Sequence, residues 1–289
     1  MPIILDGDPA NAGNPIYGYA DWSDAAALSC TSTVEGTNVL ANLQTEQPSS
    51  IASLAASSMV TIIADRGTSE PWNALFLLYH NLTSSAVVRV RSADTLLGTT
   101  AAPQVDSGNL VAWGDADYRR WARRHSWWFP PIPFLGPTES DAIESRFLRI
   151  EITDMANPDG FIRIGRLIAG AFTQFSRAQQ LGRSKGYNDK SKITDTVDGR
   201  KIPTPASPRP VQKFSVKCVG HDAESELEAF SDNIERIRGA SRSVLIMVRP
   251  NMTAHAHRNL VYGLLELGPQ TKEDDFQQYE QAISIEGLT

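Results

Sequence analysis

The chain has 289 residues, 41% of them hydrophobic and 21% charged, which is enough apolar material for one large folded domain or two ordinary ones. Its 27 Lys and Arg against 33 Asp and Glu give a net charge of −6, which argues against a protein that coats nucleic acid, because phosphate-binding surfaces need a basic excess. No apolar run approaches the roughly 20 residues that cross a bilayer, and the segment after Met1 lacks the basic start of a secretory signal. We therefore expect a protein made in the cytoplasm, without a membrane span.

The first half of the sequence predicts an antiparallel β-sandwich. Residues 59–64 are a run rich in β-branched side chains that ends at the turn signal Asp65-Arg66-Gly67. Residues 74–79 are almost wholly apolar, as in a strand that is buried on both faces. In residues 86–91, valine alternates with arginine, which indicates one buried and one exposed face. Short strands separated by turns favour a sandwich over βαβ units. Two further strands are predicted over residues 147–152 and 161–169.

A basic, proline-rich segment opens the second half. Residues 178–210 have little periodicity, and four prolines fall between Pro203 and Pro210, so we expect a long extended arm of polyproline type. The stretch from Arg183 to Lys217 has a net charge of +6, which leaves −12 for the rest of the chain. We infer that the arm contacts an acidic surface, and we favour one on a neighbouring subunit. Its basic candidate residues are Arg183, Lys185, Lys190, Lys192, Arg200, Lys201 and Arg209.

Beyond the arm, the pattern predicts strands around a single helix. Alternation over residues 212–218 indicates a half-buried strand. Residues 225–238 predict the helix, because Ser225 and Glu228 can form a capping box and apolar side chains recur at helical spacing. The helix and the residues just before it carry six acidic side chains, which would suit the basic arm. Three closing strands are predicted over residues 243–248, 260–267 and 279–285.

The most unusual segment is residues 117–134, which hold three of the six tryptophans and four arginines. Aromatic and arginine side chains anchor protein interfaces, and guanidinium groups stack on indole rings. Three interpretations remain open: a loop that contacts another protein, a loop that folds over its own sandwich, and a platform that stacks on a sugar ring. The candidate residues are Tyr118, Arg119, Arg120, Trp121, Arg123, Arg124, Trp127, Trp128 and Phe129.

Catalytic and metal-binding patterns are weak throughout the sequence. His255 and His257 would share a face of an extended stretch, but no carboxylate or cysteine lies close by to complete a ligand set. His80 follows the apolar run 74–79, where a buried turn is the simpler interpretation. Cys30 and Cys218 are too few for a disulfide framework or a cysteine metal site. We expect no catalytic residue, no metal and no cofactor, although a spatial pair of carboxylates is not visible in a sequence.

Two stretches resemble tail-tip proteins of long-tailed, non-contractile bacteriophages. Residues Trp72–Arg91 are similar to the strand, His-Asn-Leu and strand signature of galactose-binding-like jelly rolls found in such proteins. Residues Gly160–Gly170, with the later Gly186–Asp189, resemble the segment by which that jelly roll passes into a second, tube-like domain. The resemblance extends over about residues 55–289, but it does not include the aromatic loop 117–134.

The resemblance implies a mainly β chain in two domains. Residues 1–169 would be a jelly-roll β-sandwich, and residues 170–289 a tail-tube-like β domain with one α-helix and the arm 178–210. It also implies a non-enzymatic distal-tail or baseplate protein of the virion, assembled in the host cytoplasm. Such a protein forms a ring, hexameric by preference or trimeric, that joins the tail tube to tip or hub proteins while DNA passes without specific binding.

Two alternative functions remain open from the sequence. The first is a carbohydrate-binding module that recognises a glycan on the host surface, because jelly rolls carry many unrelated functions. The second is an enzyme that degrades the cell envelope.

Overall fold

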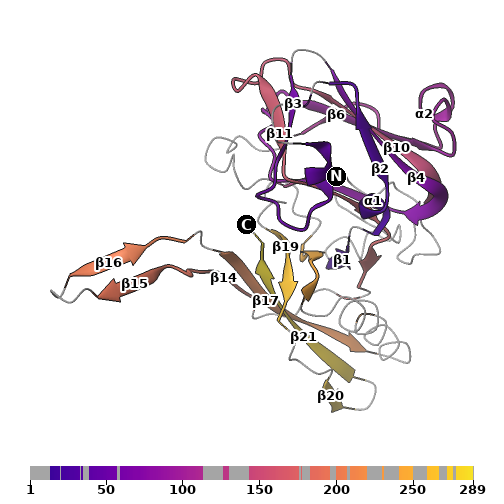
Figure 1. Ribbon diagram of the computed structural model, residues 1–289. Helices are drawn as coiled ribbons and strands as arrows, with labels where there is room; N and C mark the ends of the chain where they lie inside the picture. The colour runs from indigo at the N-terminus through magenta and orange to yellow at the C-terminus, as the bar shows by residue number, and fades with distance from the viewer. Residues whose placement is uncertain are drawn as a thin grey trace. The chain divides into compact units, whose positions relative to one another are not determined.

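The computed structural model shows a mainly β chain built from antiparallel sheets (Figure 1). It separates into two compact units, and the first combines Met1–Phe175 with Met247–Leu260, whereas the second combines Ser176–Ile246 with Val261–Thr289. The residues that the structure describes are 14–19, 21–32, 34, 39–56, 59–112, 126–129, 143–175, 177, 183–195, 200–206, 209–219, 230, 241–249, 259–266, 272–275 and 278–288.

The larger sheet of the first unit has the strand order β2-β4-β10-β6-β7, with β8 also paired to β6. Along β4, β10 and β6, every second side chain points to the core and the others form the opposite face, as the alternating sequence predicts. The core-facing side chains are valine, isoleucine, alanine and leucine. The strands are β2 (Ala27–Cys30), β4 (Val60–Trp72), β6 (Val87–Ala93), β7 (Val105–Asp106), β8 (Leu110–Val111) and β10 (Ile143–Thr153).

Two smaller sheets and a short strand pair complete the described part of the first unit. Every residue of β5 is buried, which confirms the strand predicted from its apolar run. Leu75 and Leu77 join the core of the sandwich, whereas the Phe76 ring lies 5.1 Å from the ring of Phe172. The expected antiparallel sandwich is therefore confirmed. The pairings are β3 (Ala52–Ala55) with β11 (Phe161–Ile164), β5 (Ala74–Leu78) with β12 (Arg166–Gly170) and β9 (Ser126–Phe129), and β1 (Ile16–Gly18) with β13 (Thr173–Gln174).

The turn signal at Asp65-Arg66-Gly67 does not end a strand, as the sequence predicted, but lies inside β4. The register with β10 shifts here, so that the residues between Asp65 and Glu70 bulge out opposite Arg146. Gly67 takes a positive φ of 84°, which glycine adopts without strain. Arg146 closes the bulge with two hydrogen bonds to the Asp65 carboxylate, of 2.7 and 2.9 Å.

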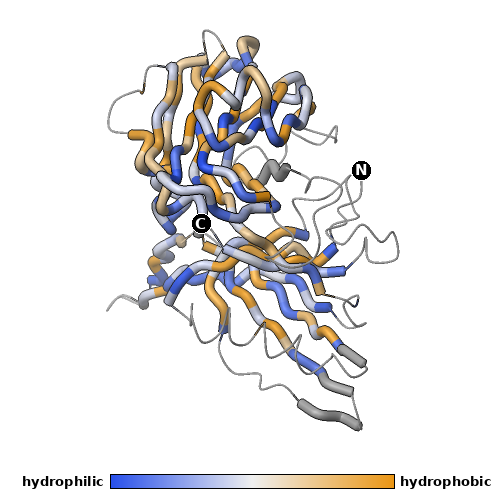
Figure 2. Tube along the Cα trace, turned by 90° about the vertical axis from the view of Figure 1, so that its right-hand side faces the viewer, coloured by the Kyte–Doolittle hydropathy of each residue, from blue (hydrophilic) through white to orange (hydrophobic). Residues whose placement is uncertain are grey.

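The second unit contains a sheet in which β21 pairs with β17, β19 and β20, and β17 also pairs with β14. Hydrophobic and hydrophilic positions alternate along strands of this sheet and of the sandwich (Figure 2). The strands predicted over 212–218, 243–248, 260–267 and 279–285 are all present. The bounds are β14 (Ser184–Asn188), β17 (Arg209–Val219), β18 (Val244–Met247), β19 (Leu260–Leu265), β20 (Lys272–Asp275) and β21 (Gln278–Gly287).

The predicted polyproline arm is instead a β-hairpin. β15 (Lys192–Asp195) and β16 (Lys201–Thr204) form a two-stranded sheet of their own, beyond the ribbon of β14 and β17 (Figure 1). Two of the four prolines lie in strands of this ribbon. Pro203 lies in a strand with an open edge, and Pro210 precedes the pairing of β17 with β21, which begins at Val211.

The described helices are all short. The helix predicted over residues 225–238 lies outside the described residues except for Phe230, which is helical and buried. No helix within the described ranges is long and apolar enough to cross a membrane. The described helices are α1 (Asp21–Asp24), the 3-10 helix η2 (Leu40–Gln44) and α2 (Gly98–Ala101).

Candidate functional site

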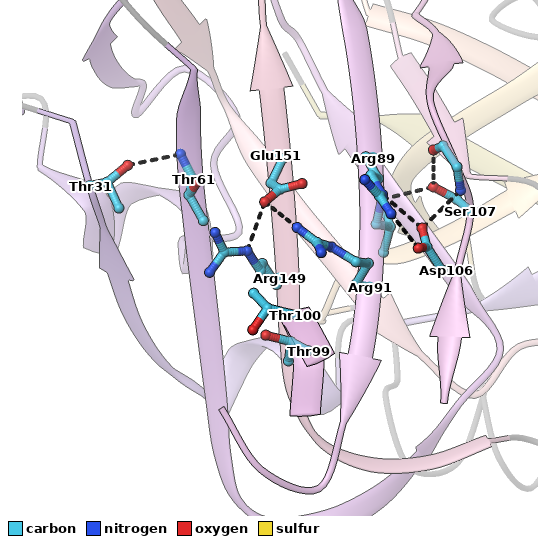
Figure 3. A network of polar contacts seen from close by, with 12 residues as sticks. Thr31, Thr61, Arg89, Arg91, Thr99, Thr100, Asp106, Ser107, Arg149 and Glu151 are labelled. Atoms are coloured by element: carbon cyan, nitrogen blue, oxygen red, sulfur yellow. Dashed lines mark hydrogen bonds and ion pairs between the residues drawn. The ribbon is translucent and has the colours of Figure 1, made fainter. Parts of the chain in front are cut away.

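A charged network covers the side of the large sheet that faces away from the core of the first unit (Figure 3). Strand register places Arg149 of β10 directly opposite Arg91 of β6, and Glu151 opposite Arg89. The Nε of Arg149 donates to Oε1 of Glu151 at 2.8 Å, and Nη2 of Arg91 donates to the same oxygen. The Arg91 and Glu151 side chains are only 10% and 8% exposed. One carboxylate therefore neutralises two guanidinium groups that have little access to water.

A second ion pair continues this network toward the edge of the sheet. Arg89 donates from Nε and Nη2 to the two carboxylate oxygens of Asp106, a bidentate arrangement. The Gly108 N–H also donates to Asp106, at 3.0 Å. These contacts, led by the Arg89 hydrogen bonds, lower the pKa of Asp106 to about 2. This pair is more open than the first, because the Arg89 and Asp106 side chains are 36% and 31% exposed.

Glu151 is under two opposing influences. Burial raises the pKa of its carboxyl group, but the hydrogen bonds and positive charges of Arg149 and Arg91 outweigh burial and lower the pKa below its ordinary value of 4.5. Across the described ranges, no three His, Cys, Asp or Glu side chains gather as a metal site would require. What the arrangement does chemically is to tie β10 to β6 by charge.

The His-Asn-Leu signature lies in a loop that is fixed by hydrogen bonds within the first unit. Nδ2 of Asn81 donates to the Phe161 carbonyl at 3.0 Å, while its Oδ1 accepts from the Arg163 N–H at 2.7 Å. Thr83 donates to the buried Asp154 from both its N–H and its hydroxyl. His80 is buried, and its Nδ1 accepts from the Leu82 N–H. Asn81 therefore fixes this loop to β11 and Thr83 fixes it to Asp154, while the buried His80 fits the interpretation as a turn residue.

The hairpin arm of the second unit is anchored at its base by Glu286 of β21. Its carboxylate accepts from Nδ2 of Asn188 at 3.2 Å and lies 3.4 Å from Nζ of Lys190 and 3.3 Å from Nη1 of Arg209. Asn188 and Arg209 face each other across the ribbon of β14 and β17. One side chain, itself 16% exposed, thus holds both strands of the arm at the point where they leave the sheet.

Beyond this anchor, a short elbow leads to the hairpin tip. The Ser191 N–H donates to the Asp189 side chain at 2.8 Å, and the Ser191 hydroxyl accepts from the Ala206 N–H at 2.9 Å. The second bond crosses from one side of the hairpin to the other. In the tip, Ile193 is 68% exposed and Ile202 53% exposed.

The candidate basic residues of the arm do not form one cluster. Lys190 and Arg209 meet at Glu286, whereas Lys192 and Lys201 lie in the exposed tip. Register places them away from each other, since Lys192 pairs with Thr204 and Lys201 with Asp195. The remaining candidates lie in or beside the strands of the arm, and they are Arg183, Lys185 and Arg200.

The aromatic segment is described only in part. Its residues Trp127, Trp128 and Phe129 belong to strand β9, whereas the sequence predicted a loop. They pair along the backbone with Leu77, Phe76 and Leu75 of β5, so this piece of the segment extends the chain's own sheet. The other candidates lie outside the described residues, as do His255 and His257, and they are Tyr118, Arg119, Arg120, Trp121, Arg123 and Arg124.

Sequence reasoning missed the carboxylates that organise both regions. Glu286 lies one residue past the predicted strand 279–285, and Glu151 appeared only as an outward-facing residue of its strand. Alternation identified the face of Glu151 but did not include Glu286, and each acts through partners that are far away in sequence. Glu286 is 98 residues from Asn188, and Glu151 is 60 residues from Arg91. For Glu286, the only signal in the sequence was the presence of an acidic residue that could pair with the basic arm.

No protein-family model and no curated protein matches this chain. Similar solved structures include CpGH89CBM32-5 from Clostridium perfringens, in complex with GalNAc-β-1,3-galactose (9% identity, 53% of this chain and 99% of that chain, TM-score 0.37). Another is XRCC1 bound to the DNA polymerase β catalytic domain (13%, 50% and 95%, TM-score 0.38). A third is chitosan-binding module 1 from a chitosanase/glucanase of Paenibacillus sp. IK-5 (12%, 51% and 96%, TM-score 0.35).

Replacement of Glu151 by Gln tests the charged network. The variant leaves Arg91 and Arg149 without a countercharge, and we expect the free energy of unfolding at pH 7 to fall by about 3–5 kcal/mol. Because the folded protein lowers the pKa of Glu151, the wild-type contribution is complete above about pH 4.5 and is lost as the pH falls through the lower, folded-state pKa. Urea unfolding followed by circular dichroism at pH 7 and at acid pH measures both effects.

The matched control is Asp106→Asn, which breaks the more exposed pair and is expected to cost no more than about 1 kcal/mol. Equal losses in the two variants, or a Glu151→Gln loss that does not shrink in acid, would contradict this account of the network.

Proposed function

We propose that this chain is a non-enzymatic structural protein that assembles with copies of itself through the hairpin arm. The observation that carries the proposal is the free-standing tip formed by β15 and β16. A two-stranded hairpin is at best marginally stable alone in water, because it has no third strand or helix against which to pack. The exposed Ile193 and Ile202 add apolar surface to this tip.

Charge supports a second copy of the chain as the molecule that the arm contacts. The stretch from Arg183 to Lys217 has a net charge of +6, and the rest of each chain has a net charge of −12. A basic arm and an acidic body on every copy attract one another across subunits, and such attraction favours correct encounters. Because the arm and its docking surface are different patches, the contact is heterologous, and a heterologous contact closes into a ring if its rotation permits.

The sequence resemblance indicates where in a virion this assembly would act. We propose a ring, hexameric by preference or trimeric, at the tip of a phage tail in the virion, where it joins the tail tube to tip or hub proteins. The two stretches Trp72–Arg91 and Gly160–Gly170 carry that part of the proposal. The acidic balance of the chain suits a channel through which DNA passes without being held, since a net negative surface does not retain phosphate.

Removal of the hairpin tip tests self-assembly. In the variant, a Gly-Gly link joins Ser191 to Pro205 and replaces residues 192–204, while the Glu286 anchor stays in place. We expect a folded protein with the mass of a single chain, whereas the wild type has the mass of several. Light scattering after gel filtration measures the mass, and circular dichroism checks the fold.

A control with Lys192→Arg and Lys201→Arg keeps the charge of the tip and is expected to assemble like the wild type. A tip-deleted protein that still forms the wild-type oligomer would contradict the proposal.

Carbohydrate binding by the first unit is a second candidate function. The observation that favours it is the presence of Trp127 and Trp128 in β9, because the face of an indole ring supplies a large, rigid contact surface for a sugar ring. Among the described strands of its three-stranded sheet, β9 takes an outer position next to β5, so the backbone of the pair lies at a border of that sheet. In this role, the ligand would be a glycan of the host surface.

Tryptophan fluorescence tests this second candidate. Purified bacterial surface polysaccharide is expected to change the emission of the wild-type protein in a saturable manner, and the change is expected to disappear in Trp127→Ala/Trp128→Ala. The Trp127→Phe/Trp128→Phe variant, which keeps aromatic rings, serves as the control for folding. A signal that persists in the alanine variant, or no signal from the wild type, would contradict sugar binding at this pair.

A further inference from the structure

The charges at the centre of the network on the large sheet do not balance. Arg91 and Arg149 both donate to Oε1 of Glu151, which supplies a single negative charge. The neighbouring pair of Arg89 and Asp106 is balanced one to one. Two guanidinium groups therefore share one carboxylate, and one positive charge is left without a counterion among the described residues.

Hydrogen-bond donors are in excess at the same place. Each guanidinium group has five N–H donors and no acceptor. Arg149 uses its Nε on Glu151, whereas its Nη1 and Nη2 have no partner in the part of the chain that the structure describes. The Nε of Arg91 is buried and also lacks a partner. Figure 3 shows that the end of the Arg149 side chain points away from Glu151, toward β4.

Limited access to water makes this excess unfavourable. The Arg91 and Glu151 side chains are 10% and 8% exposed, and the Arg149 side chain is 19% exposed. A charge that is largely removed from water is costly unless it is paired and hydrogen-bonded. Arg149 is the most open of the three side chains, and it also carries the unpartnered Nη groups. The unbalanced charge can therefore be reached from outside.

We propose that Arg149 and Arg91 form a binding site for an oxyanion, which is a carboxylate, sulfate or phosphate group, on the outward side of the large sheet. Nη1 and Nη2 of Arg149 form a planar fork that matches two oxygens of such a group. The bound anion supplies the second negative charge that the two guanidinium groups lack. This inference goes beyond the proposed self-assembly and does not depend on it.

Replacement of Arg149 by Gln tests the site. The variant removes the fork but leaves Arg91 and Glu151 paired one to one, so we expect it to fold, which circular dichroism checks. Calorimetric titration with sodium sulfate at constant ionic strength is expected to show saturable binding to the wild type. Binding to Arg149→Gln is expected to be at least about 10-fold weaker, because hydrogen bonds to a charged group are lost.

The matched control is Arg146→Gln, which lies on the same strand and lowers the charge of the chain by the same amount. Arg146 is already balanced by the Asp65 carboxylate, to which it makes two hydrogen bonds, so this variant is expected to bind sulfate like the wild type. Equal weakening in Arg146→Gln and Arg149→Gln, or no saturable binding by the wild type, would overturn the proposal.

Two further titrations extend the test. Glu151→Gln removes the carboxylate that competes with the anion, and we expect sulfate to bind about 10-fold more tightly to this variant. A folded Glu151→Gln protein without that gain would count against the charge balance. Galacturonate and polygalacturonate carry the same carboxylate as a free acid and on a polysaccharide, so tighter binding of the polymer assigns the site to an acidic glycan, and equal binding assigns it to a free anion. Either result supports the site only if Arg149→Gln abolishes it, and binding that survives in this variant would overturn the proposal.

Discussion

A two-stranded ribbon has no core of its own, so it is stable only through contacts at its ends or with other surfaces. This constraint explains the organisation of the arm in the second unit. The arm leaves the sheet as the pair β14 and β17, so its direction has to be fixed at its base, and its tip has no described strand or helix to pack against. Glu286 supplies the first, because its one carboxylate contacts side chains of both strands of the arm. The chain supplies no described partner for the tip, where two isoleucines stay exposed. We base the proposed assembly on this difference: the base of the arm is held within the chain, whereas its tip is not.

The first unit also contains one carboxylate that is shared by several cations, but there it does not anchor an extension. Glu151 accepts from Arg91 and Arg149 on a sheet whose other face is packed against the core, so the ions reinforce pairing that already exists. The charged network of the first unit thus lies on a packed sheet, whereas the anchor of the second unit lies at the base of an extension. In the function that we propose, the first unit is the body and the arm is the part that reaches another molecule.

Local sequence patterns predicted those strands well in which each residue's burial follows from its position along the strand. The apolar run of β5 and the valine–arginine alternation of β6 are clear because each position is read from its neighbours. The arm was mispredicted because its prolines suggested polyproline, and the sequence does not reveal that Pro203 lies in a two-stranded ribbon or that Pro210 precedes the pairing of β17 with β21. The turn signal at Gly67 was correct as local chemistry but lies in a bulge, since the rest of β4 continues to pair with β10 beyond it.

The candidate site was harder to predict, because its charges meet only in the folded chain. Arg91 was expected on an exposed face, yet it is nine-tenths buried through its contact with Glu151. Glu286 lies just beyond the predicted strand 279–285, and no local pattern marks it as an anchor. The basic arm was recognisable from composition alone, whereas the division of its residues between an anchor and an exposed tip required the register of the hairpin.

Hydrogen exchange of the β15 and β16 amides, followed by mass spectrometry over a range of protein concentrations, tests the central claim most directly. Our account predicts rapid exchange when the protein is dilute and monomeric, because the ribbon has two open edges and no core. It predicts slow exchange at concentrations where the chains associate, because the tip then contacts another copy. An associated protein whose tip amides still exchange as rapidly as in the monomer would contradict the account.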